Sequence, residues 1–380
     1  MKVSRSLKVA AAVVAVSALA ANSAVAAVSI TAGGSSFAAP LINACKVAWQ
    51  TSTGNTLTYT TSSSGTGQTN ENNGIGDFNF SDSSYTSTKS TVVHIPVVAA
   101  PIAVGYNLPN QSKDLYLSQK TLSDIFAGNV TKWNDPEIAA DNNRTVTVTI
   151  FKKDGNGNPI KDSSGKPVVV NTVTKKIYYT LPNQNIRIVA RADSSGTTAN
   201  FVKLFNAQFP SVWSKPNDKT FINDFPGNIN SSTNLGRIQT ATGSAGVAAT
   251  MAKTPYSIGY FESSYATGNL RNALIGNAAG GFAAPDAAGT SAFLGSATAT
   301  ADGKLTFNYN TTTPGAYVLG IVSYALVDSA ATGDNAKAAK SFLQYVLSSA
   351  CPTSAPTLGF ATITGSLLDL DNKLLASLKA

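Results

Sequence analysis

The sequence of 380 residues contains a single histidine, His94, and only two cysteines, Cys45 and Cys351. One histidine excludes a conventional metal site built from several histidines, and it leaves a serine hydrolase dependent on His94 alone as its base. Charged residues make up only 13% of the chain, and the basic ones are scattered, which argues against nucleic-acid binding. After the N-terminal region, no apolar run is long enough to suggest a membrane span. We therefore expect neither a metal nor a cofactor.

The N-terminal residues are typical of an export signal. Lys2, Arg5 and Lys8 precede or flank an apolar run over 9–21, and small residues ending at Ala26 resemble a cleavage site. We expect cleavage after Ala26, which lowers the formal net charge from +8 to +5 because it removes three basic residues and no acid. The cleavage site lacks a cysteine, so no lipid anchor is expected. The mature chain is predicted to be soluble and exported.

An oxidising compartment favours pairing of the two cysteines. We predict a disulfide between Cys45 and Cys351, which would tie the first helix to the C-terminal region. The alternative, two buried free thiols that behave as small apolar groups, stays open on the sequence alone.

Helical and β-type apolar patterns alternate through most of the chain. Helical spacing covers 40–49, 197–209 and 338–350, whereas 92–108 and 317–327 are apolar, β-branched runs typical of buried strands. The alternation of strands and helices predicts an α/β fold.

Two segments depart from this alternation. Residues 144–182 contain two β-rich, alternating stretches around a turn-rich sequence, which predicts an inserted β-hairpin. Residues 275–303 are rich in Ala, Gly, Thr and Ser, and we expect them to form irregular surface.

Three predicted strand-to-helix junctions are rich in serine, threonine and glycine, at 32–40, 60–68 and 191–201. Helix N-termini present unpaired N–H groups and a partial positive charge, and ligands of α/β sheets bind outside the carboxyl ends of the strands. Together the three junctions indicate a site for a small tetrahedral anion.

Arg191 and Asp82 give this predicted site its charges. Arg191 precedes the helix start at 195–197, and its planar fork of donors suits an oxyanion. Asp82 suits an anion that still carries a proton, as phosphate does at neutral pH and sulfate does not, because a carboxylate accepts a P–OH bond and repels sulfate. The alternatives are structural: Arg191 paired with Asp193 beside a serine cap, and Asp82 as a cap or turn residue.

Six segments resemble, in the same order, the periplasmic phosphate-binding proteins of ABC phosphate importers. They are TAGGSSFAAP (31–40), SSSGTG (62–67), DFNFSDSS (77–84), TLSDIFAGNVTKWNDPEI (121–138), RADSSGTTANF (191–201) and GVAATMAKTPYSIGYFESSYA (246–266). The fourth segment is the most specific identifier, and the fifth carries most of the function. The resemblance implies a type II periplasmic binding protein: two α/β lobes joined by crossover strands, which close on a ligand in the cleft between them.

The resemblance also implies a site and lobe boundaries. Phosphate would be bound by Ser35, Ser36, Phe37, Ser64, Asp82, Arg191, Ser195, Gly196 and Thr197, with Asp193 orienting the arginine and Ser63 as the alternative donor to Ser64. Ser36 stands where a threonine is common in the family, which keeps the hydroxyl. Lobe 1 would comprise about 27–106 and 266–380, and lobe 2 about 107–265.

The function implied is capture of inorganic phosphate and its delivery to the membrane permease of an ABC phosphate importer, without chemistry on the ligand. We expect a monomer, periplasmic where the cell has an outer membrane and otherwise secreted or wall-associated. Two alternatives are a secreted phosphatase-like enzyme and a surface or adhesive protein built on the same fold.

Overall fold

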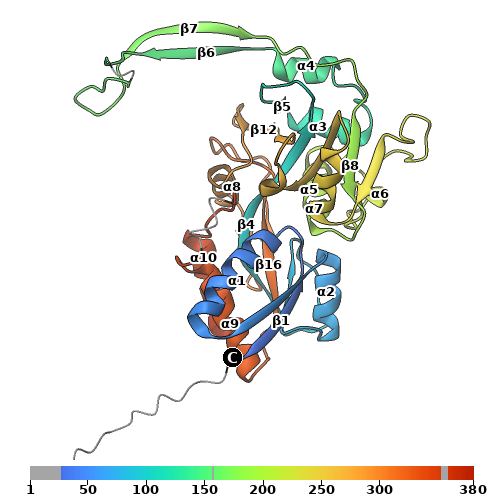
Figure 1. Ribbon diagram of the computed structural model, residues 1–380, viewed down its shortest axis with the longest axis vertical. Coiled ribbons are helices and arrows are strands. Elements are labelled where there is room, and N and C mark those ends of the chain that lie inside the picture. The colour runs from blue at the N-terminus through green and yellow to red at the C-terminus, as the bar shows by residue number, and fades with distance from the viewer. Residues whose placement is uncertain (1–26, 156–157, 352–357) are drawn as a thin grey trace, which may run out of the picture.

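The computed structural model describes residues 27–155, 158–351 and 358–380, and the predicted export segment, residues 1–26, lies outside the described residues (Figure 1). The described residues form a nine-stranded mixed sheet, three smaller sheets and helices packed against them. The predicted α/β class is confirmed.

The large sheet has the strand order β2-β1-β3-β16-β4-β10-β8-β9, and β11 also pairs with β4. Its strands are β1 (Ser29–Gly34), β2 (Thr56–Thr61), β3 (Phe78–Ser81), β4 (Val92–Asn107), β8 (Arg187–Arg191), β9 (Ile238–Ala241), β10 (Ser257–Glu262), β11 (Arg271–Asn272) and β16 (Gly320–Asp328). The apolar run 92–108 forms one strand rather than two. β4 pairs with β16 as far as Pro101 and with β10 from Ile102 onward. A single buried strand therefore joins the two halves of the sheet, one formed by β2, β1, β3 and β16 and the other by β10, β8 and β9.

Helices cover both halves of this sheet. They are α1 (Ala39–Thr53), α2 (Ser64–Asn73), α3 (Gln119–Ala127), α4 (Pro136–Asn142), α5 (Gly196–Gln208), α6 (Phe221–Asp224), α7 (Gly243–Ala252), the 3-10 helix η1 (Ser263–Tyr265), α8 (Ala287–Leu294), α9 (Asp334–Leu347) and α10 (Gly365–Ser377). In Figure 1, α1 and α9 lie on one side of β1, and α2 lies on the other. The helices predicted over 197–209 and 338–350 are confirmed as α5 and α9.

The prediction of irregular surface for 275–303 is wrong in part, because this stretch contains α8. Asp286 begins that helix as its N-cap, and its Oδ1 accepts a hydrogen bond from the backbone N–H of Gly289 at 2.7 Å. The high alanine content had suggested irregular surface, but alanine is also the residue with the highest helix propensity. The short strands β12 (Leu274–Gly276), β13 (Phe282–Ala283), β14 (Thr298–Ala299), β15 (Leu305–Thr306) and β5 (Tyr116–Leu117) complete the two smaller sheets around this region.

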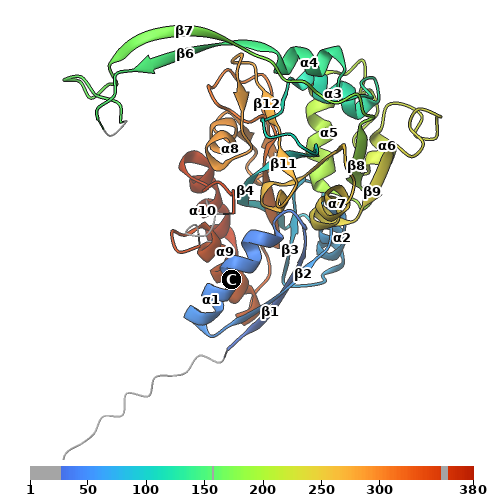
Figure 2. The ribbon, with the colours of Figure 1, turned by 45° about the horizontal axis from the view of Figure 1, so that its top comes forward.

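Strands β6 (Arg144–Phe151) and β7 (Val169–Ile177) form an antiparallel pair of their own. The pair projects from the body of the molecule beside α4, as Figures 1 and 2 show. Its base is anchored by Tyr179, which is buried: its backbone N–H donates to Asn143 Oδ1 at 2.7 Å and its hydroxyl to the carbonyl of Lys113 at 3.0 Å.

Cys45 in α1 and Cys351, just after α9, form a disulfide, as the sequence predicted. The two residues are separated by 306 positions. The bond therefore joins the first helix to the segment that follows α9.

The disulfide is expected to contribute measurably to stability, because it closes a very long loop in the unfolded chain. Replacing both cysteines with serine should lower the free energy of unfolding by about 3–5 kcal/mol and the Tm by about 5–10 °C. Calorimetry with and without a reducing agent tests this: reductant should lower the Tm of the parent protein and leave the double variant unchanged. Equal Tm values for the two proteins under oxidising conditions would contradict it.

Asp371 is a fully buried ionisable group. It lies in α10 with no exposed surface, and neither carboxylate oxygen has a hydrogen-bond partner among the described residues. Burial raises the pKa of Asp371 from 3.8 to about 9. The folded state therefore holds the proton that the unfolded state releases, and this contribution to stability is lost as the pH rises from about 4 to about 9.

Asp371→Asn is consequently expected to stabilise the protein at alkaline pH. The advantage of the variant over the parent should grow by about 2–4 kcal/mol between pH 4.5 and pH 8.5, because asparagine has no charge to desolvate. Urea denaturation at the two pH values measures it. Asp369→Asn, an exposed position of the same helix, is the matched control and should follow the parent. A parallel response of all three proteins to pH would rule out this assignment of the pH dependence.

Candidate functional site

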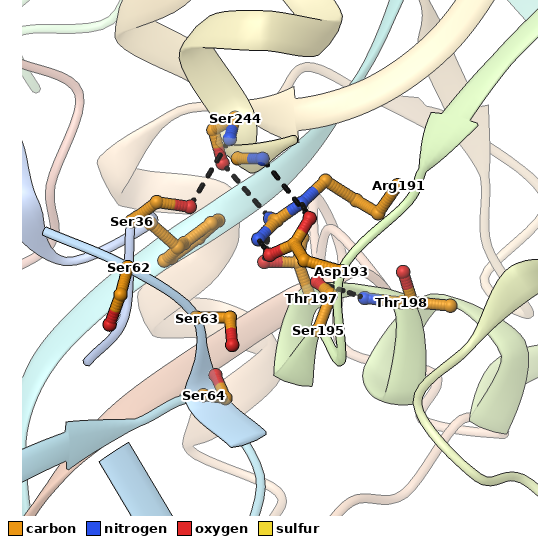
Figure 3. Close-up of polar contacts among 12 residues, drawn as sticks. Ser36, Ser62, Ser63, Ser64, Arg191, Asp193, Ser195, Thr197, Thr198 and Ser244 are labelled. Atoms are coloured by element: carbon orange, nitrogen blue, oxygen red, sulfur yellow. Dashed lines mark hydrogen bonds and ion pairs between the residues drawn. The ribbon is translucent and has the colours of Figure 1, made fainter. Parts of the chain in front are cut away.

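The candidate site lies where several strands end and the next helices begin (Figure 3). β1 pairs in parallel with β2 and β3, and β8 pairs in parallel with β9 and β10, so within each half the carboxyl ends of the strands share one edge. The loops that leave those ends lead into α1, α2, α5 and α7. Helix N-termini and their unpaired N–H groups therefore gather at one place.

The loop between β1 and α1 brings two serines to the site. Ser35 Oγ accepts from the backbone N–H groups of Phe37 and Ala38 at 3.1 and 3.0 Å, which satisfies donors at the start of the helix. Ser36 Oγ points elsewhere and accepts from the backbone N–H of Ser244 at 3.2 Å. Ser35, Ser36 and Phe37 are all buried.

Ser63 and Ser64 have different roles at the start of α2. Ser63 is the N-cap, and its Oγ accepts from the backbone N–H of Thr66 at 3.2 Å. Ser64 Oγ accepts from the backbone N–H of Asp82 at 3.0 Å and donates to Asp82 Oδ2 at 3.2 Å. Of the two serines, Ser64 is thus the one in contact with the carboxylate.

Asp82, directly after β3, is the centre of the hydrogen-bond network, and only 3% of it is exposed. Ser35 Oγ donates to one carboxylate oxygen, and Thr197 Oγ1 donates to the other at 3.1 Å. Burial raises the pKa of Asp82 above its ordinary value, although these hydroxyls and the charge of Arg191 act in the opposite direction. An ionised carboxylate can only accept, so a ligand atom placed against it has to bring its own hydrogen.

Arg191, the last residue of β8, is 1% exposed and is held by Asp193. Its Nε donates to Asp193 Oδ1 at 2.8 Å and its Nη2 donates to Oδ2, a two-pronged pair that fixes the plane of the guanidinium. The backbone N–H of Gly243 donates to the same carboxylate at 3.0 Å. Burial alone would raise the pKa of Asp193, but the hydrogen bond and charge of Arg191 hold it below its ordinary value.

The pairing with Asp193 leaves Nη1 of Arg191 facing hydroxyl groups. Nη1 lies 3.4 Å from Thr197 Oγ1 and 3.5 Å from Ser244 Oγ, at the outer limit of a hydrogen bond. Asp193 thus contacts Nε and Nη2 of Arg191 and leaves Nη1 outside the pair, and the predicted role of Arg191 in anion binding stays a prediction.

The start of α5 is shaped to approach α2 closely. Ser195 is its N-cap, and its Oγ accepts from the backbone N–H of Thr198 at 3.1 Å. A Cβ at Gly196 would lie 2.5 Å from Ser64 Oγ and 2.8 Å from the backbone nitrogen of Ser83. Only glycine fits at this position, because any side chain would push the two helix starts apart.

Aromatic packing fixes this helix start from behind. The ring of Phe201 stacks on that of Tyr260 with centroids 4.4 Å apart, and Phe126 meets Phe201 edge to face at 4.7 Å. The buried Tyr260 hydroxyl bonds Thr198 Oγ1 at 2.7 Å and accepts from the backbone N–H of Arg191 at 3.3 Å. One tyrosine therefore holds both the end of β8 and the beginning of α5.

The loops of the two halves touch each other around the site. The backbone N–H of Gly65 donates to the carbonyl of Ser194 at 2.9 Å, and Asn200 Nδ2 donates to the carbonyl of Asp82 at 2.6 Å. Lys219 Nζ donates to Gln68 Oε1 at 2.6 Å. These contacts join segments that are more than a hundred residues apart in the chain.

The structure brings all nine predicted ligand residues to one place, and it adds Ser244, which the sequence analysis did not single out. Ser244 lies in the first turn of α7, where its N–H donates to Ser36 and its hydroxyl faces Arg191 (Figure 3). A signal was present, because GSAG at 243–246 is another serine- and glycine-rich junction between a strand and a helix.

The arrangement suits a small anion that carries a hydrogen. The charge of Asp193 balances that of Arg191, so an ionised Asp82 gives the three groups a formal net charge of −1. The partial positive charges of the helix N-termini and the hydroxyl donors offset this negative charge. A cavity of about 330 Å³ adjoins Asp82, and Lys203 and Lys219 also line it. Among the described residues, no group of three or more histidine, cysteine, aspartate or glutamate side chains could hold a metal ion.

Comparison with known proteins places the chain among binding proteins. A family model described as PBP superfamily domain matches residues 20–350. The chain is similar to phosphate-binding protein PstS 3 of Mycobacterium tuberculosis, with 32% identity over 238 residues, 60% of this chain and 52% of that protein. It is 29% identical to phosphate-binding protein PstS of Haemophilus influenzae over 262 residues, 67% of this chain and 64% of that protein. The match thus spans about half to two thirds of these relatives.

Solved structures establish the fold. A phosphate-bound periplasmic phosphate-binding protein (PfluDING) superposes with a TM-score of 0.66 at 18% identity, over 93% of this chain and 94% of that one. A phosphate ABC transporter substrate-binding protein from Clostridium perfringens, described as putative and with bound phosphate, gives 0.55 at 14% identity, over 88% and 100%. The predicted type II periplasmic-binding-protein fold is confirmed.

Proposed function

The chain belongs to the PBP superfamily, and from that membership and the geometry of its site we propose that it is an exported protein that captures inorganic phosphate. The observation that carries the proposal is that a buried carboxylate, Asp82, and a buried guanidinium, Arg191, both contact the hydroxyl of Thr197 at the start of a helix. Phosphate needs both groups, because at neutral pH it is an anion that still carries a proton.

Each predicted contact has a chemical role in this proposal. Nη1 of Arg191 donates to a phosphate oxygen, and Asp82 accepts the P–OH hydrogen. The hydroxyls and backbone N–H groups of Ser36, Phe37, Ser64, Ser195, Gly196 and Thr197 surround the remaining oxygens, with Ser35 holding Asp82 in place. Sulfate is rejected because it has no proton for Asp82 and places a negative charge against that carboxylate.

Binding is proposed to be coupled to closure of two lobes, about 27–106 with 266–380 and about 107–265. Support comes from the origin of the groups: Ser36, Ser64 and Asp82 belong to the first lobe, and Arg191 and Thr197 to the second. A ligand that bonds both sets stabilises the closed form by its differential affinity for that form. In this proposal, the contacts between Gly65 and Ser194 and between Asn200 and Asp82 form when the lobes close.

The bound phosphate is proposed to be handed to the permease of an ABC importer, outside the cytoplasmic membrane. This follows the printed descriptions of the similar proteins and the predicted export segment. Among the residues that the structure describes, no helix has the length and apolar character needed to cross a bilayer. The protein is proposed to act as a monomer, without a cofactor and without changing its ligand.

A phosphatase-like enzyme is the alternative, and the position of His94 weighs against it. His94 lies in β4, where its Nε2 accepts from the backbone N–H of Tyr85 at 3.3 Å and its ring packs between Tyr85 and Tyr324. Burial lowers the pKa of His94 to about 4. To act as a base, His94 would need a hydrogen bond to one of the site serines, but its Nε2 is bonded to the backbone of Tyr85 instead.

Calorimetric titration of the ligand-stripped protein at neutral pH tests the proposal. We expect tight binding of phosphate and a sulfate affinity weaker by at least about 1,000-fold, since an unpaired buried like charge costs several kcal/mol. A phosphate monoester is added in parallel, and release of inorganic phosphate from it is measured. Folded protein that does not bind phosphate refutes the proposal. Hydrolysis of the monoester would then indicate a phosphatase-like enzyme, and absence of hydrolysis would indicate a surface or adhesive protein.

A further inference from the structure

The projecting hairpin is the largest feature of the molecule that the anion site does not use. We call its described residues, 144–155 and 158–178, the arm. β6 and β7 pair only with each other among the described residues, so both outer edges of the ribbon are open. Figures 1 and 2 show the arm extending away from both halves of the large sheet.

The arm carries the net charge of the protein. Of 28 basic and 20 acidic residues in the sequence, three basic ones fall in the N-terminal 26 residues, and seven basic and two acidic ones fall in the arm. The rest of the chain, outside residues 1–26 and the arm, therefore has eighteen basic and eighteen acidic residues and a net charge of zero. The arm has a net charge of +5. The basic residues of the arm are Arg144, Lys152, Lys153, Lys161, Lys166, Lys175 and Lys176.

The arm also carries most of the exposed large apolar side chains. Seven of the eleven in the described chain lie on it: Val148, Ile150, Phe151, Val169, Val170, Val173 and Tyr178. A two-stranded ribbon has no core of its own, so apolar side chains on it stay in water unless something covers them.

The register of the ribbon sorts its side chains by face. Residues directly opposite in an antiparallel pair share a face, and the pairs Val148–Val173 and Thr149–Thr172 are opposite. One face therefore presents Val146, Val148, Ile150 and Val173 together with the polar Asn171 and Lys175. The other presents Thr145, Thr147, Thr149, Thr172, Thr174 and Lys176.

We propose that the arm docks on an anionic lipid bilayer, with its aliphatic face toward the acyl chains and its lysines among the headgroups. An anionic bilayer complements both features of the arm. Its negatively charged headgroups attract the lysines, and the apolar layer beneath the headgroups can cover the exposed apolar side chains. Lysine stems can lie along apolar surface while the ammonium groups stay at the headgroup level. The proposal is independent of the anion site and of its ligand.

Charge favours this occupant over a second copy of the chain. The open edges of β6 and β7 could pair with another arm, but two arms of +5 repel each other when they approach edge to edge. The lysines also lie on both faces and along the outer part of the ribbon, which matches a surface of laterally mobile charges.

Co-sedimentation with vesicles tests the proposal. The exported protein, its N-terminus defined by mass spectrometry, is mixed with vesicles of equimolar phosphatidylglycerol and phosphatidylcholine, in saturating inorganic phosphate so that the anion site cannot bind headgroups. We expect binding that weakens as salt is added. Replacing Lys152, Lys153, Lys175 and Lys176 with glutamine should lower the partition coefficient at least about 50-fold, because each lysine near such a surface contributes roughly fivefold.

Matched controls separate the arm from total charge and from folding. Lys253, Lys337, Lys373 and Lys379, exposed positions outside the arm, are changed to glutamine in a second variant, which should bind vesicles nearly as the parent does. A third variant, Val148→Thr with Ile150→Thr and Val173→Thr, keeps β propensity and should bind more weakly at every salt concentration, with the salt dependence of the parent because its lysines are unchanged. Phosphate titration should be unchanged in all three.

Several results would overturn the proposal. They are absence of vesicle binding by the parent protein, equal binding to pure phosphatidylcholine, and equal binding by the arm variant and its control. Concentration-dependent dimers that disappear in the threonine variant would assign the arm to a second copy instead.

Discussion

Replacing Arg191 with alanine is expected to lower the affinity for phosphate by about 10- to 150-fold through the lost hydrogen bond alone, since a hydrogen bond to a charged group contributes about 1.5–3 kcal/mol. The loss has a second source. Asp193 is held ionised by Arg191, and without the guanidinium its carboxylate faces the site as an uncompensated negative charge. Calorimetric titration with phosphate at neutral pH measures the change in Kd.

Three further variants identify the cause of that loss. Arg187→Ala removes an exposed arginine from the same strand, and its Kd should stay within about twofold of the parent, as is usual for surface positions. Arg191→Lys keeps the charge without the fork and should give an intermediate affinity. Arg191→Ala with Asp193→Ala should recover part of the loss if the exposed carboxylate repels phosphate.

Stability has to be measured beside affinity, because Arg191 and Asp193 are a buried pair. Removing one partner is expected to cost about 3–5 kcal/mol of unfolding free energy. Titration is therefore done below the Tm of each variant. A folded Arg191→Ala protein that binds phosphate like the parent would exclude the proposed role of this residue.

The fold was predictable to the extent that local patterns determine it. The apolar faces of α5 and α9 and the buried run of β4 have periods that identify them without tertiary information. The pairing of strands was not predictable in this way. The two ends of β4 pair with different strands, β16 and β10, and the periodicity of its sequence does not specify these partners. The helix α8 was missed because its sequence is amphipathically weak and rich in small residues.

The candidate site was predictable where its chemistry is local. Arg191, Ser195 and Gly196 lie together in the sequence at a strand-to-helix junction, and helix geometry alone predicts an anion-binding role for such a junction. Two residues that reach the site only through the tertiary structure were not predicted. Tyr260 and Asn200 read as ordinary members of a strand and a helix, and only the folded chain brings them to Arg191 and Asp82.

Asp82→Asn is expected to change selectivity more than any other substitution. Asparagine keeps the size of the side chain but removes the charge that repels sulfate, and its amide can donate where the carboxylate could only accept. We expect phosphate affinity to fall about 10- to 100-fold and sulfate affinity to rise by a similar factor, in keeping with about 1–3 kcal/mol for a buried polar group left mispaired. Competition titrations with both anions give the ratio, and Asp334→Asn, a 79% exposed control in α9, should leave it unchanged.

The pH dependence of sulfate binding separates charge from shape as the cause of this selectivity. Burial raises the pKa of Asp82 in the folded protein, so its carboxyl group takes up a proton at a higher pH than an exposed aspartate does. As the pH falls through that pKa, repulsion of sulfate is lost, and the parent protein should bind sulfate increasingly well. The amide of the Asp82→Asn variant has no proton to gain, so this variant should bind sulfate with little pH dependence. If sulfate is rejected equally at every pH by both proteins, the shape of the site, rather than the charge of Asp82, excludes it.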